Sequence, residues 1–347
     1  MKNEKTLNDV ELMSLIQTLV ETPGPSGQEH IIREKIKEMV KGIADEIRTD
    51  ALGNLLCRMG NKKENGKRIM VSAHIDEIGL MVIHVDENGF ARFVPVGGIN
   101  PLTCMGGRVL FMNGAQGVIG AERLEPNIMP KLENLFIDTG ATSAADSPVK
   151  IGDVCGFDRP MLDLGKRVSA KSMDDRIAAV IAIMAMRALA KLPASKRGPN
   201  EVWFVFSTQE EVGIRGATTA AYGVDPEVGF AIDVTLTGDT PRAYKRPMAL
   251  GKGACIKVRD SSFIADTRVV DWMINEAKSQ GIPYQMEVLD AGGTDGRAIQ
   301  MTRAGVPAGC ISLACRYVHS PSEMVDKNDL DACIKLTVGL VSKEVKL

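Results

Sequence analysis

The sequence predicts an α/β fold in which helices flank a mostly parallel central sheet and a small all-β domain is inserted. From about residue 166 onward, apolar runs of strand length alternate with helical patterns, which is typical of a parallel sheet covered by helices. Residues 80–165 differ, because short β-like runs there are separated by glycine-rich turns such as Gly97-Gly98. We therefore assign residues 1–76 and 167–347 to the α/β domain, and residues 77–166 to a β-barrel-like insertion.

The segment before the insertion contains two predicted helices and one strand. Apolar residues recur at helical spacing over residues 11–22, and the helix ends at Pro23 because proline cannot continue it. Ser26 and Glu29 have the spacing of a capping box, so a second helix is expected directly after them. Residues 68–73 form a short apolar run that predicts a buried strand.

After the insertion, the alternation resumes and continues to the end of the chain. The apolar periodicity predicts strands near residues 201–207, 228–233, 254–258, 284–288 and 309–314. Between and after them it predicts helices near residues 174–191, 216–222, 267–280, 295–304 and 327–343.

Composition excludes several classes of function. The 347 residues carry a net charge of −2, which favours neither nucleic acid nor an anionic membrane surface as a partner. The longest apolar run, residues 177–186, is shorter than the roughly 20 residues that a membrane-spanning helix needs. The first residues lack the apolar core of a signal peptide, so we expect a cytoplasmic protein.

The cysteines predict neither a disulfide framework nor a thiolate metal site. There are seven of them, an odd number, and none forms a Cys-x-x-Cys pair. We expect reduced, mostly buried thiols. Of the four histidines, His30 and His84 lack a partner pattern and are expected to face solvent, which leaves His74 and His319 as candidates for a site.

Polar residues follow several predicted strands at the point where each strand ends. His74 and Asp76 follow the strand at 68–73, Glu210-Glu211 follow the strand at 201–207, Asp233 ends the next strand, and His319 comes shortly after the last strand. Sites in open α/β sheets lie at the carboxyl ends of the strands. Asp174-Asp175 adds an acidic pair where Ser172 could begin a helix. Each feature alone has an ordinary explanation, but the joint pattern predicts one shared site.

The residue types at this edge indicate metal chemistry. Neutral imidazoles with carboxylates suit zinc, cobalt or manganese. In His74-x-Asp76, the aspartate is placed to accept the imidazole N–H of a histidine ligand. Two metal ions about 3.5–4 Å apart need a shared ligand, usually a carboxylate, and Asp174 is the candidate for that role.

Five motifs resemble the tetrahedral aminopeptidases, a family of metallopeptidases that includes glutamyl aminopeptidases and proteins labelled FrvX or cellulase M. They are SAHIDEIG (72–79), KSMDDR (171–176), STQEEVG (207–213), AIDVT (231–235) and RYVHSPSEM (316–324). Supporting stretches are TPGPSGQE (22–29), PVGGINP (95–101), AGGTDGRAIQ (291–300) and GVPAGCISL (305–313), so the resemblance extends over the whole chain in order.

The resemblance implies a zinc-peptidase-like fold and a role for each site residue. One metal ion would be held by His74, Asp174 and Asp233, and the other by Asp174, Glu211 and His319. Glu210 matches the general acid/base of the family, and Asp76 matches the residue that orients His74. The family usually has a cis peptide bond after the bridging aspartate. Its inserted domain mediates dimerisation, and the usual assembly is a dodecamer that is built from dimers and encloses a cavity.

We therefore predict a dinuclear aminopeptidase that removes N-terminal residues from short peptides, with two Zn²⁺ or Co²⁺ ions per subunit. The ions would lower the pKa of a shared water, and Glu210 would accept its proton and return it to the leaving amine. The side chain preferred at the substrate's first position is not set by these motifs. The candidate segments for its pocket are residues 235–239 and 292–295.

Three alternatives stay open at this point. A related metal-dependent amidase or deacylase would use the same metal site. An endo-β-glucanase is disfavoured, because glycosidases need only a carboxyl pair and the chain has just two tryptophans to stack on sugars. A metal-stabilised assembly protein is disfavoured because a structural site has no use for a general base such as Glu210.

Overall fold

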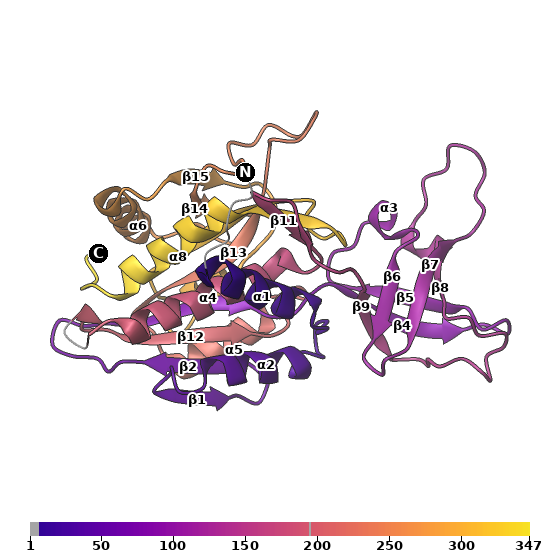
Figure 1. The fold of residues 1–347 in the computed structure, drawn as a ribbon, viewed down its shortest axis with the longest axis horizontal. Helices are drawn as coiled ribbons and strands as arrows, with labels where there is room; N and C mark the ends of the chain where they lie inside the picture. The colour runs from indigo at the N-terminus through magenta and orange to yellow at the C-terminus, as the bar shows by residue number, and fades with distance from the viewer. Residues whose placement is uncertain (1–6, 194–195) are drawn as a thin grey trace.

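A large layered α/β part and a smaller barrel lie side by side in the computed structural model (Figure 1). The structure describes residues 7–193 and 196–347. The chain enters the barrel after the third strand of the large sheet and returns to that sheet afterwards. The predicted combination of an α/β fold with a small inserted β module is therefore confirmed.

The large sheet is mixed, with parallel strands only at its centre. Its strands run in the order β1-β2-β12-β3-β13-β16-β17-β11-β10, and β14 branches from β16 to pair with β15. The central strands β12, β3, β13 and β16 are parallel, as is the β14–β15 pair, whereas the other pairs are antiparallel. The prediction of a mostly parallel sheet was therefore wrong outside the centre, because the flanking strands β2, β14 and β17 each join the central strands in the antiparallel direction. The strands are β1 (Glu46–Thr49), β2 (Leu55–Met59), β3 (Arg68–His74), β10 (Leu162–Asp163), β11 (Arg167–Ala170), β12 (Glu201–Ser207), β13 (Val228–Leu236), β14 (Ala254–Arg259), β15 (Tyr284–Val288), β16 (Ala308–Arg316) and β17 (Glu323–Asp326).

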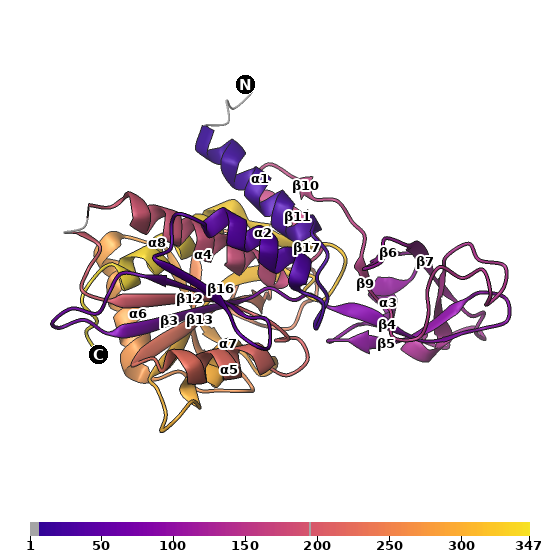
Figure 2. The same cartoon turned by 90° about the horizontal axis from the view of Figure 1, so that it is seen from below.

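Helices cover both faces of this sheet (Figure 2). On one face α4 packs against β3 and β13, and α1, α2 and α8 pack against α4, while α6 packs against α8 and β14. On the other face α5 and α7 pack against each other and against the central strands. The helices are α1 (Leu7–Glu21), α2 (His30–Val40), α4 (Met173–Lys191), α5 (Arg215–Val224), α6 (Thr267–Gln280), α7 (Asp295–Gln300) and α8 (Lys327–Val341).

Helix α4 explains the longest apolar run of the sequence. Residues 177–183 and 185–186 are buried, because the helix lies between the sheet and the outer helices. The run is thus the centre of the core of the α/β part. Among the described residues, no helix has both the length and the apolar character needed to cross a membrane.

The inserted barrel is closed and has its own core. Its strands follow the order β4-β5-β8-β7-β6-β9, and alternate side chains such as Leu80, Phe93 and Ile137 point into a separate apolar cluster. The barrel also contains a short helix and a 3₁₀ turn. Its elements are β4 (Gly79–Val85), β5 (Ala91–Val96), α3 (Pro101–Cys104), β6 (Arg108–Phe111), β7 (Gln116–Ala121), the 3₁₀ turn Leu132–Asn134, β8 (Leu135–Asp138) and β9 (Val154–Phe157).

Several smaller predictions were tested by the structure. His30 and His84 are exposed, and all seven cysteines are free and buried, as expected. Helix α7 ends four residues before the predicted boundary, and Arg303 adopts a left-handed backbone conformation (φ 54°) that a helix cannot contain.

The two serines that were expected to begin helices do not cap them. Helix α2 begins after Glu29 without a side-chain cap, and the hydroxyl of Ser26 donates instead to Asp76. Ser172 has a left-handed backbone conformation (φ 56°), and its hydroxyl donates to Glu77. In both cases the hydroxyl donates to a buried carboxylate, and no side-chain oxygen accepts from the first N–H groups of the helix as it would in a cap.

Arg176 joins three segments of the chain inside the core. Its side chain is fully buried and donates hydrogen bonds to the carbonyl oxygens of Ile75 (2.7 Å), Leu19 (2.7 Å) and Thr22 (2.8 Å). It also lies 3.7 Å from the carboxylate of Glu77. The guanidinium therefore fixes the end of β3 and the loop after α1 against α4.

Replacement of this arginine should destabilise the protein strongly. We expect Arg176→Met to lower the free energy of unfolding by about 3–5 kcal/mol, because the buried Glu77 loses a compensating charge and three carbonyls lose their donor. Arg187→Met is the control, since Arg187 forms a surface pair with Glu11 (2.9 Å) that should contribute less than about 1 kcal/mol. Denaturant unfolding measures both, and equal stability of the two variants would contradict this role.

Candidate metal centre

The carboxyl edge of the central parallel strands carries the candidate site. Strand β3 ends at His74, which pairs in register with Ser207 at the end of β12. Glu210 and Glu211 follow in the loop after β12, and Asp233 lies on the neighbouring strand β13. His74, Asp174, Glu210, Glu211, Asp233 and His319 all line one cavity of about 480 Å³. The structure thus brings together six of the seven predicted site residues around one space, and Asp76 lies behind His74.

Two groups of potential ligand atoms share Asp174. Ligand atoms of His74, Asp174 and Asp233 lie within 4.8 Å of one another, and so do those of Asp174, Glu211 and His319. Oδ1 of Asp174 lies 3.0 Å from Nε2 of His74, and its Oδ2 lies 3.3 Å from Nε2 of His319. Nε2 of His319 also lies 3.1 Å from the carboxylate of Glu211. The two oxygens of one carboxylate therefore face the two histidines, one each.

The backbone around Asp174 is irregular. The peptide bond between Asp174 and Asp175 is cis, as the resemblance implied. Both residues have non-helical backbone angles although they lie in the first turn of α4. The amide N–H of Asp174 donates to the buried carboxylate of Glu323 (2.9 Å), so the shared aspartate is held by its main chain as well as by its neighbours.

The site concentrates negative charge in a buried place. Burial, reinforced by the charge of Asp174, raises the pKa of Asp233 well above its usual range and raises that of Glu211. Burial alone would raise the pKa of Asp174 as well, but its hydrogen bonds with His319 and His74 lower it. One oxygen of Glu211, Oε1, is buried without a hydrogen-bond partner. Clustered carboxylates and an unpaired buried oxygen are what a bound cation would neutralise.

The same negative charges also raise the pKa values of the histidines, because they stabilise the protonated imidazoles. Burial opposes the charging of His319, but its contacts with Asp174 and Glu211 outweigh burial and raise its pKa to about 12. For His74, contacts with Asp174 and Asp76 likewise overcome burial and raise the pKa well above its usual value. A metal ion would replace the proton on Nε2 of each imidazole, which faces Asp174, because histidine binds metals in its neutral form.

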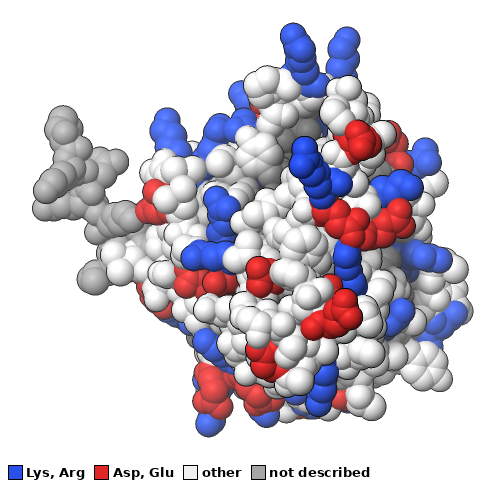
Figure 3. All heavy atoms as spheres, turned by 90° about the vertical axis from the view of Figure 1, so that its right-hand side faces the viewer, with Lys and Arg blue, Asp and Glu red and all other residues white. Residues whose placement is uncertain are grey.

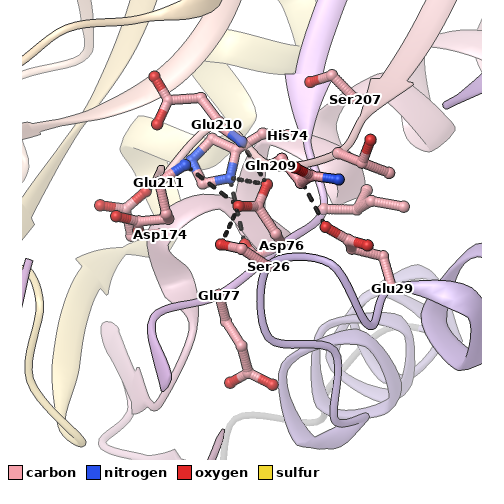
Figure 4. A network of polar contacts seen from close by, with 12 residues as sticks. Ser26, Glu29, His74, Asp76, Glu77, Asp174, Ser207, Gln209, Glu210 and Glu211 are labelled. Atoms are coloured by element: carbon pink, nitrogen blue, oxygen red, sulfur yellow. Dashed lines mark hydrogen bonds and ion pairs between the residues drawn. The ribbon is translucent and has the colours of Figure 1, made fainter. Parts of the chain in front are cut away.

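Asp76 connects the histidine to the loop that carries the glutamates. Its Oδ1 lies 3.4 Å from Nδ1 of His74 and accepts from the backbone N–H of Glu210 (3.0 Å), and its Oδ2 accepts from the N–H of Glu211 (3.1 Å). Ser26 donates to Oδ2 as well (2.6 Å). Figure 4 shows Asp76 below the imidazole, with these contacts converging on it. Asp76 thus contacts His74, whose Nδ1 also lies 3.2 Å from the backbone carbonyl oxygen of Asp76, and holds the backbone of Glu210 and Glu211 through its carboxylate.

Glu210 and Glu211 have different surroundings although they are neighbours in sequence. Glu211 joins the ligand group with Asp174 and His319, whereas Glu210 belongs to neither group. In Figure 4 the carboxylate of Glu210 points away from Asp76. Burial, and to a smaller extent the charges of Asp233 and Asp295, raise the pKa of Glu210 well above its usual range. Glu210 is therefore a carboxyl group that can hold a proton beside the potential ligands.

Some supporting residues were missed from the sequence. Glu323 is buried and accepts from the backbone N–H groups of both Asp174 and His319 (2.7 Å for the latter). Asp295 is buried and accepts from the hydroxyls of Ser72 and Ser207, next to the ends of β3 and β12. Glu323 lies four residues after His319 within a quoted motif, but its acceptor role depends on a contact with a distant segment.

The barrel contributes one wall of the cavity. Gly98, in the segment after β5, lines the cavity, and a Cβ atom there would lie 2.8 Å from Nδ1 of His319. A Cβ at Gly97 would lie 3.2 Å from Glu211. Both glycines were singled out only as turn residues, and the structure adds that their lack of a side chain leaves room for potential ligands.

Comparison with known proteins agrees with this geometry. Residues 53–336 match the M42 glutamyl aminopeptidase family. The chain is 41% identical to a putative aminopeptidase of Acetivibrio thermocellus, over 96% of this chain and all of that protein. It is 33% identical to the lysyl aminopeptidase of Pyrococcus furiosus, over 95% of this chain and 96% of that protein.

A solved structure extends the similarity to the whole fold. The TET1 peptidase of Pyrococcus horikoshii, which can assemble into a tetrahedron or a large octahedral shell, has a TM-score of 0.83 to this chain. The two are 32% identical, and the similarity covers 95% of this chain and 99% of that one. The predicted enzyme class, a hydrolase that cleaves peptide bonds as an exopeptidase, is confirmed by these relatives, and the chain belongs to the M42 glutamyl aminopeptidase family.

Proposed function

We propose that this protein is a dinuclear metal-dependent aminopeptidase that hydrolyses the N-terminal residue from short peptides. The observation that carries the proposal is the pair of ligand groups that share Asp174, with its two oxygens facing His74 and His319. A carboxylate in this position is suited to bridge two cations. Glu210 stands beside both groups without belonging to either.

The residues fit two divalent cations. His74, Asp174 and Asp233 would hold one ion, and Asp174, Glu211 and His319 would hold the other. The unpaired Oε1 of Glu211 and the raised pKa values of Asp233 and Glu211 support this assignment, because a cation would offset the charge that now lacks compensation. Nitrogen and carboxylate oxygen donors without a thiolate suit Zn²⁺ or Co²⁺.

In this mechanism the bound ions supply Lewis acidity, which polarises the scissile carbonyl and makes a water molecule more acidic. Glu210 accepts the proton of the attacking water and later donates it to the nitrogen of the leaving amine. Burial raises the pKa of Glu210 above its usual range, and a carboxyl group with a raised pKa can both take and return a proton. Asp76 acts as a positioning residue that keeps His74 and the glutamate loop in register.

The relatives of this chain favour a substrate with a free amino terminus, because those that match it are aminopeptidases. Glu210 is the one carboxylate among the described lining residues that lies outside the two potential ligand groups. The family relationship, and not the charge of the cavity, favours the aminopeptidase over the related amidase or deacylase.

Self-association through the barrel is part of the proposal. The barrel exposes large apolar side chains, among them Val94, Val118, Ile128 and Met129, which are 40–64% exposed. Figure 3 views this end of the molecule, where uncharged surface separates scattered acidic and basic side chains. Exposed apolar surface of this kind is typical of a protein–protein contact. The assembly of the Pyrococcus horikoshii TET1 peptidase into closed shells supports the same assignment.

Substitution of the proposed general base should separate catalysis from metal binding. We expect Glu210→Gln to keep two metal ions per subunit and to lower kcat by at least about 100-fold, because proton transfer is lost while the ligands remain. Steady-state kinetics on an aminoacyl-p-nitroanilide, together with elemental analysis for the metal, measures both effects.

Two controls complete this experiment. Glu211→Gln removes a ligand and should lose metal as well as activity. N-acetylation of the substrate should abolish hydrolysis by the wild-type enzyme. Turnover of Glu210→Gln close to that of the wild type would disprove its role, and preferential cleavage of the acetylated substrate would favour the amidase.

Removal of the metal ions should make the protein less stable as the pH rises. Asp233, Glu211 and His319 have raised pKa values, so between pH 5.5 and 8 the folded chain binds more protons than the unfolded chain. Stability of the chelator-treated protein should therefore fall as pH rises over this range. Asp174, whose pKa is lowered, is ionised in both states there and adds no slope.

Reloading with Zn²⁺ or Co²⁺ should raise the melting temperature and flatten its pH dependence, because the ions replace the bound protons. Thermal unfolding at pH 5.5 and pH 8, with and without metal, tests this. A metal-free protein that is more stable at pH 8 than at pH 5.5 would contradict the charge assignment.

Charges introduced on the barrel should weaken the assembly. We expect the wild-type protein to sediment as an oligomer and the double variant Ile128→Asp/Met129→Asp to sediment as a smaller species, because two carboxylates would be buried in the contact. Val10→Asp, at an exposed apolar position of α1, is the control and should leave the assembly intact. A monomeric wild-type protein would refute self-association.

A further inference from the structure

A second groove, of about 640 Å³, lies between α5 and α7 beside the cavity of the candidate metal centre. Gly213 and Ile214 line both spaces, so the groove and the cavity are adjacent. A Cβ atom at Gly213 would meet no heavy atom within 4 Å beyond its chain neighbours, so the rim between the two spaces is open there. Figure 2 shows α5 and α7 side by side on one face of the sheet.

The groove leads from the site toward the opposite edge of the sheet. Helix α5 begins at Arg215, directly after the loop that carries Glu210 and Glu211. The carbonyl oxygen of its last residue, Val224, accepts from Arg68 (3.4 Å), which is the first residue of β3. The 10 residues of α5 span about 15 Å, and an extended peptide advances about 3.3 Å per residue. The groove is therefore long enough for about four extended residues.

The charged side chains that line the groove are both arginines. Its described lining residues include Arg297 and Arg303 and no carboxylate. Arg303 is already engaged, because its Nε lies 3.3 Å from Oδ1 of Asp225 and its guanidinium lies 3.9 Å from the centre of the Tyr222 ring. The guanidinium of Arg297, on α7, has no hydrogen-bond or ion-pair partner among the described residues. Arg297 is thus a cation that is available to an anionic ligand.

The product end of a short peptide has the features that match this groove. When the scissile bond lies at the metal centre, the residues that follow it extend out of the cavity, and the open rim at Gly213 gives them a path into the groove. Ile214, Ala298 and Met301 offer apolar surface along that path. A free carboxylate ends every unmodified peptide, and a guanidinium group can bind it through two parallel N–H···O bonds.

We propose that the groove between α5 and α7 binds the part of a short peptide that follows the scissile bond, and that Arg297 binds its terminal carboxylate. The inference rests on the proposed aminopeptidase function and adds a recognition element for the far end of the substrate. It also limits the length of the preferred substrate, because the carboxylate of a long peptide would lie beyond the reach of Arg297.

The test compares two tetrapeptides that differ only at their carboxyl end. Each begins with the residue whose p-nitroanilide the metal-loaded wild type hydrolyses fastest, continues with three alanines, and ends in a carboxylate or in an amide. We expect kcat/KM to be at least about fivefold higher for the carboxylate, because only this group accepts charge-assisted hydrogen bonds from Arg297. The ratio should fall to about one in Arg297→Gln and take an intermediate value in Arg297→Lys, which keeps the charge without the planar fork.

Two controls separate this effect from others. Both peptides are measured on the same protein, so a general loss of activity in a variant cancels from the ratio. Arg268→Gln is the matched variant, because it removes an exposed arginine from α6, on the opposite face of the sheet, and should leave the ratio unchanged. An alanine-extended octapeptide should show no preference for the carboxylate over the amide in the wild type, since its end lies past the groove.

The outcomes distinguish the inference from the function on which it rests. A wild-type ratio near one for the tetrapeptides, or a ratio that persists in Arg297→Gln, would overturn the inference alone, because both peptides are then still hydrolysed. Arg297 is exposed, so the variants should fold, and the wild-type ratio and its dependence on peptide length decide in any case. Hydrolysis of neither tetrapeptide by the metal-loaded wild type would overturn the proposed function and the inference with it.

Discussion

The site depends on the accumulation of carboxylates that are buried together. Asp174, Asp233 and Glu211 converge from α4, β13 and the loop after β12, and burial makes each unfavourable as a lone anion. The supporting contacts manage this cost: Asp76 accepts from backbone N–H groups on one side, and Glu323 does so on the other. Two histidines share the central carboxylate. The buried carboxylates still lack enough positive charge around them, and we propose that two divalent cations supply it.

Other buried carboxylates near the site also need compensation of their negative charge. Glu77, next to Asp76, is paired with Lys171 (2.6 Å) and lies near Arg176. Lys257 is paired with Glu287 and Asp260. These lysines and the arginine are themselves buried, so neither cluster can relax into solvent. Neighbouring parts of the structure thus hold charges in two ways, as ion pairs with lysine or arginine and as an acidic group whose paired side chains are histidines. That contrast distinguishes the structural clusters from the candidate metal centre.

Sequence reasoning predicted the centre of the molecule well, because its signals are local. Strand β12 and helix α4 have long apolar runs, and the polar residues that follow each strand belong to one sheet edge for topological reasons. The hairpin of β1 and β2, and the strands β11 and β17, were missed, since they are only four or five residues long. In addition, β2 pairs with β12, and β11 with β17, across a long stretch of sequence. Ser26 and Ser172 were wrongly expected to cap helices, because the local pattern does not reveal that each hydroxyl is bound to a carboxylate of a distant segment. For the same reason Glu323 and the pairing of Lys257 with Glu287 could not be predicted.

The contact between Gly98 and His319 has a consequence for the molecule as a whole. Gly98 belongs to the inserted barrel and His319 to the α/β part, and a single added carbon at Gly98 would lie 2.8 Å from the imidazole. The two parts therefore meet at the candidate metal centre, where the space beside the imidazole is too small for a methyl group. A tilt of the barrel that closed this gap would displace a histidine of the site directly. The space beside His319 therefore depends on the orientation of the barrel. A contact that fixes the barrel in this orientation also keeps that space open.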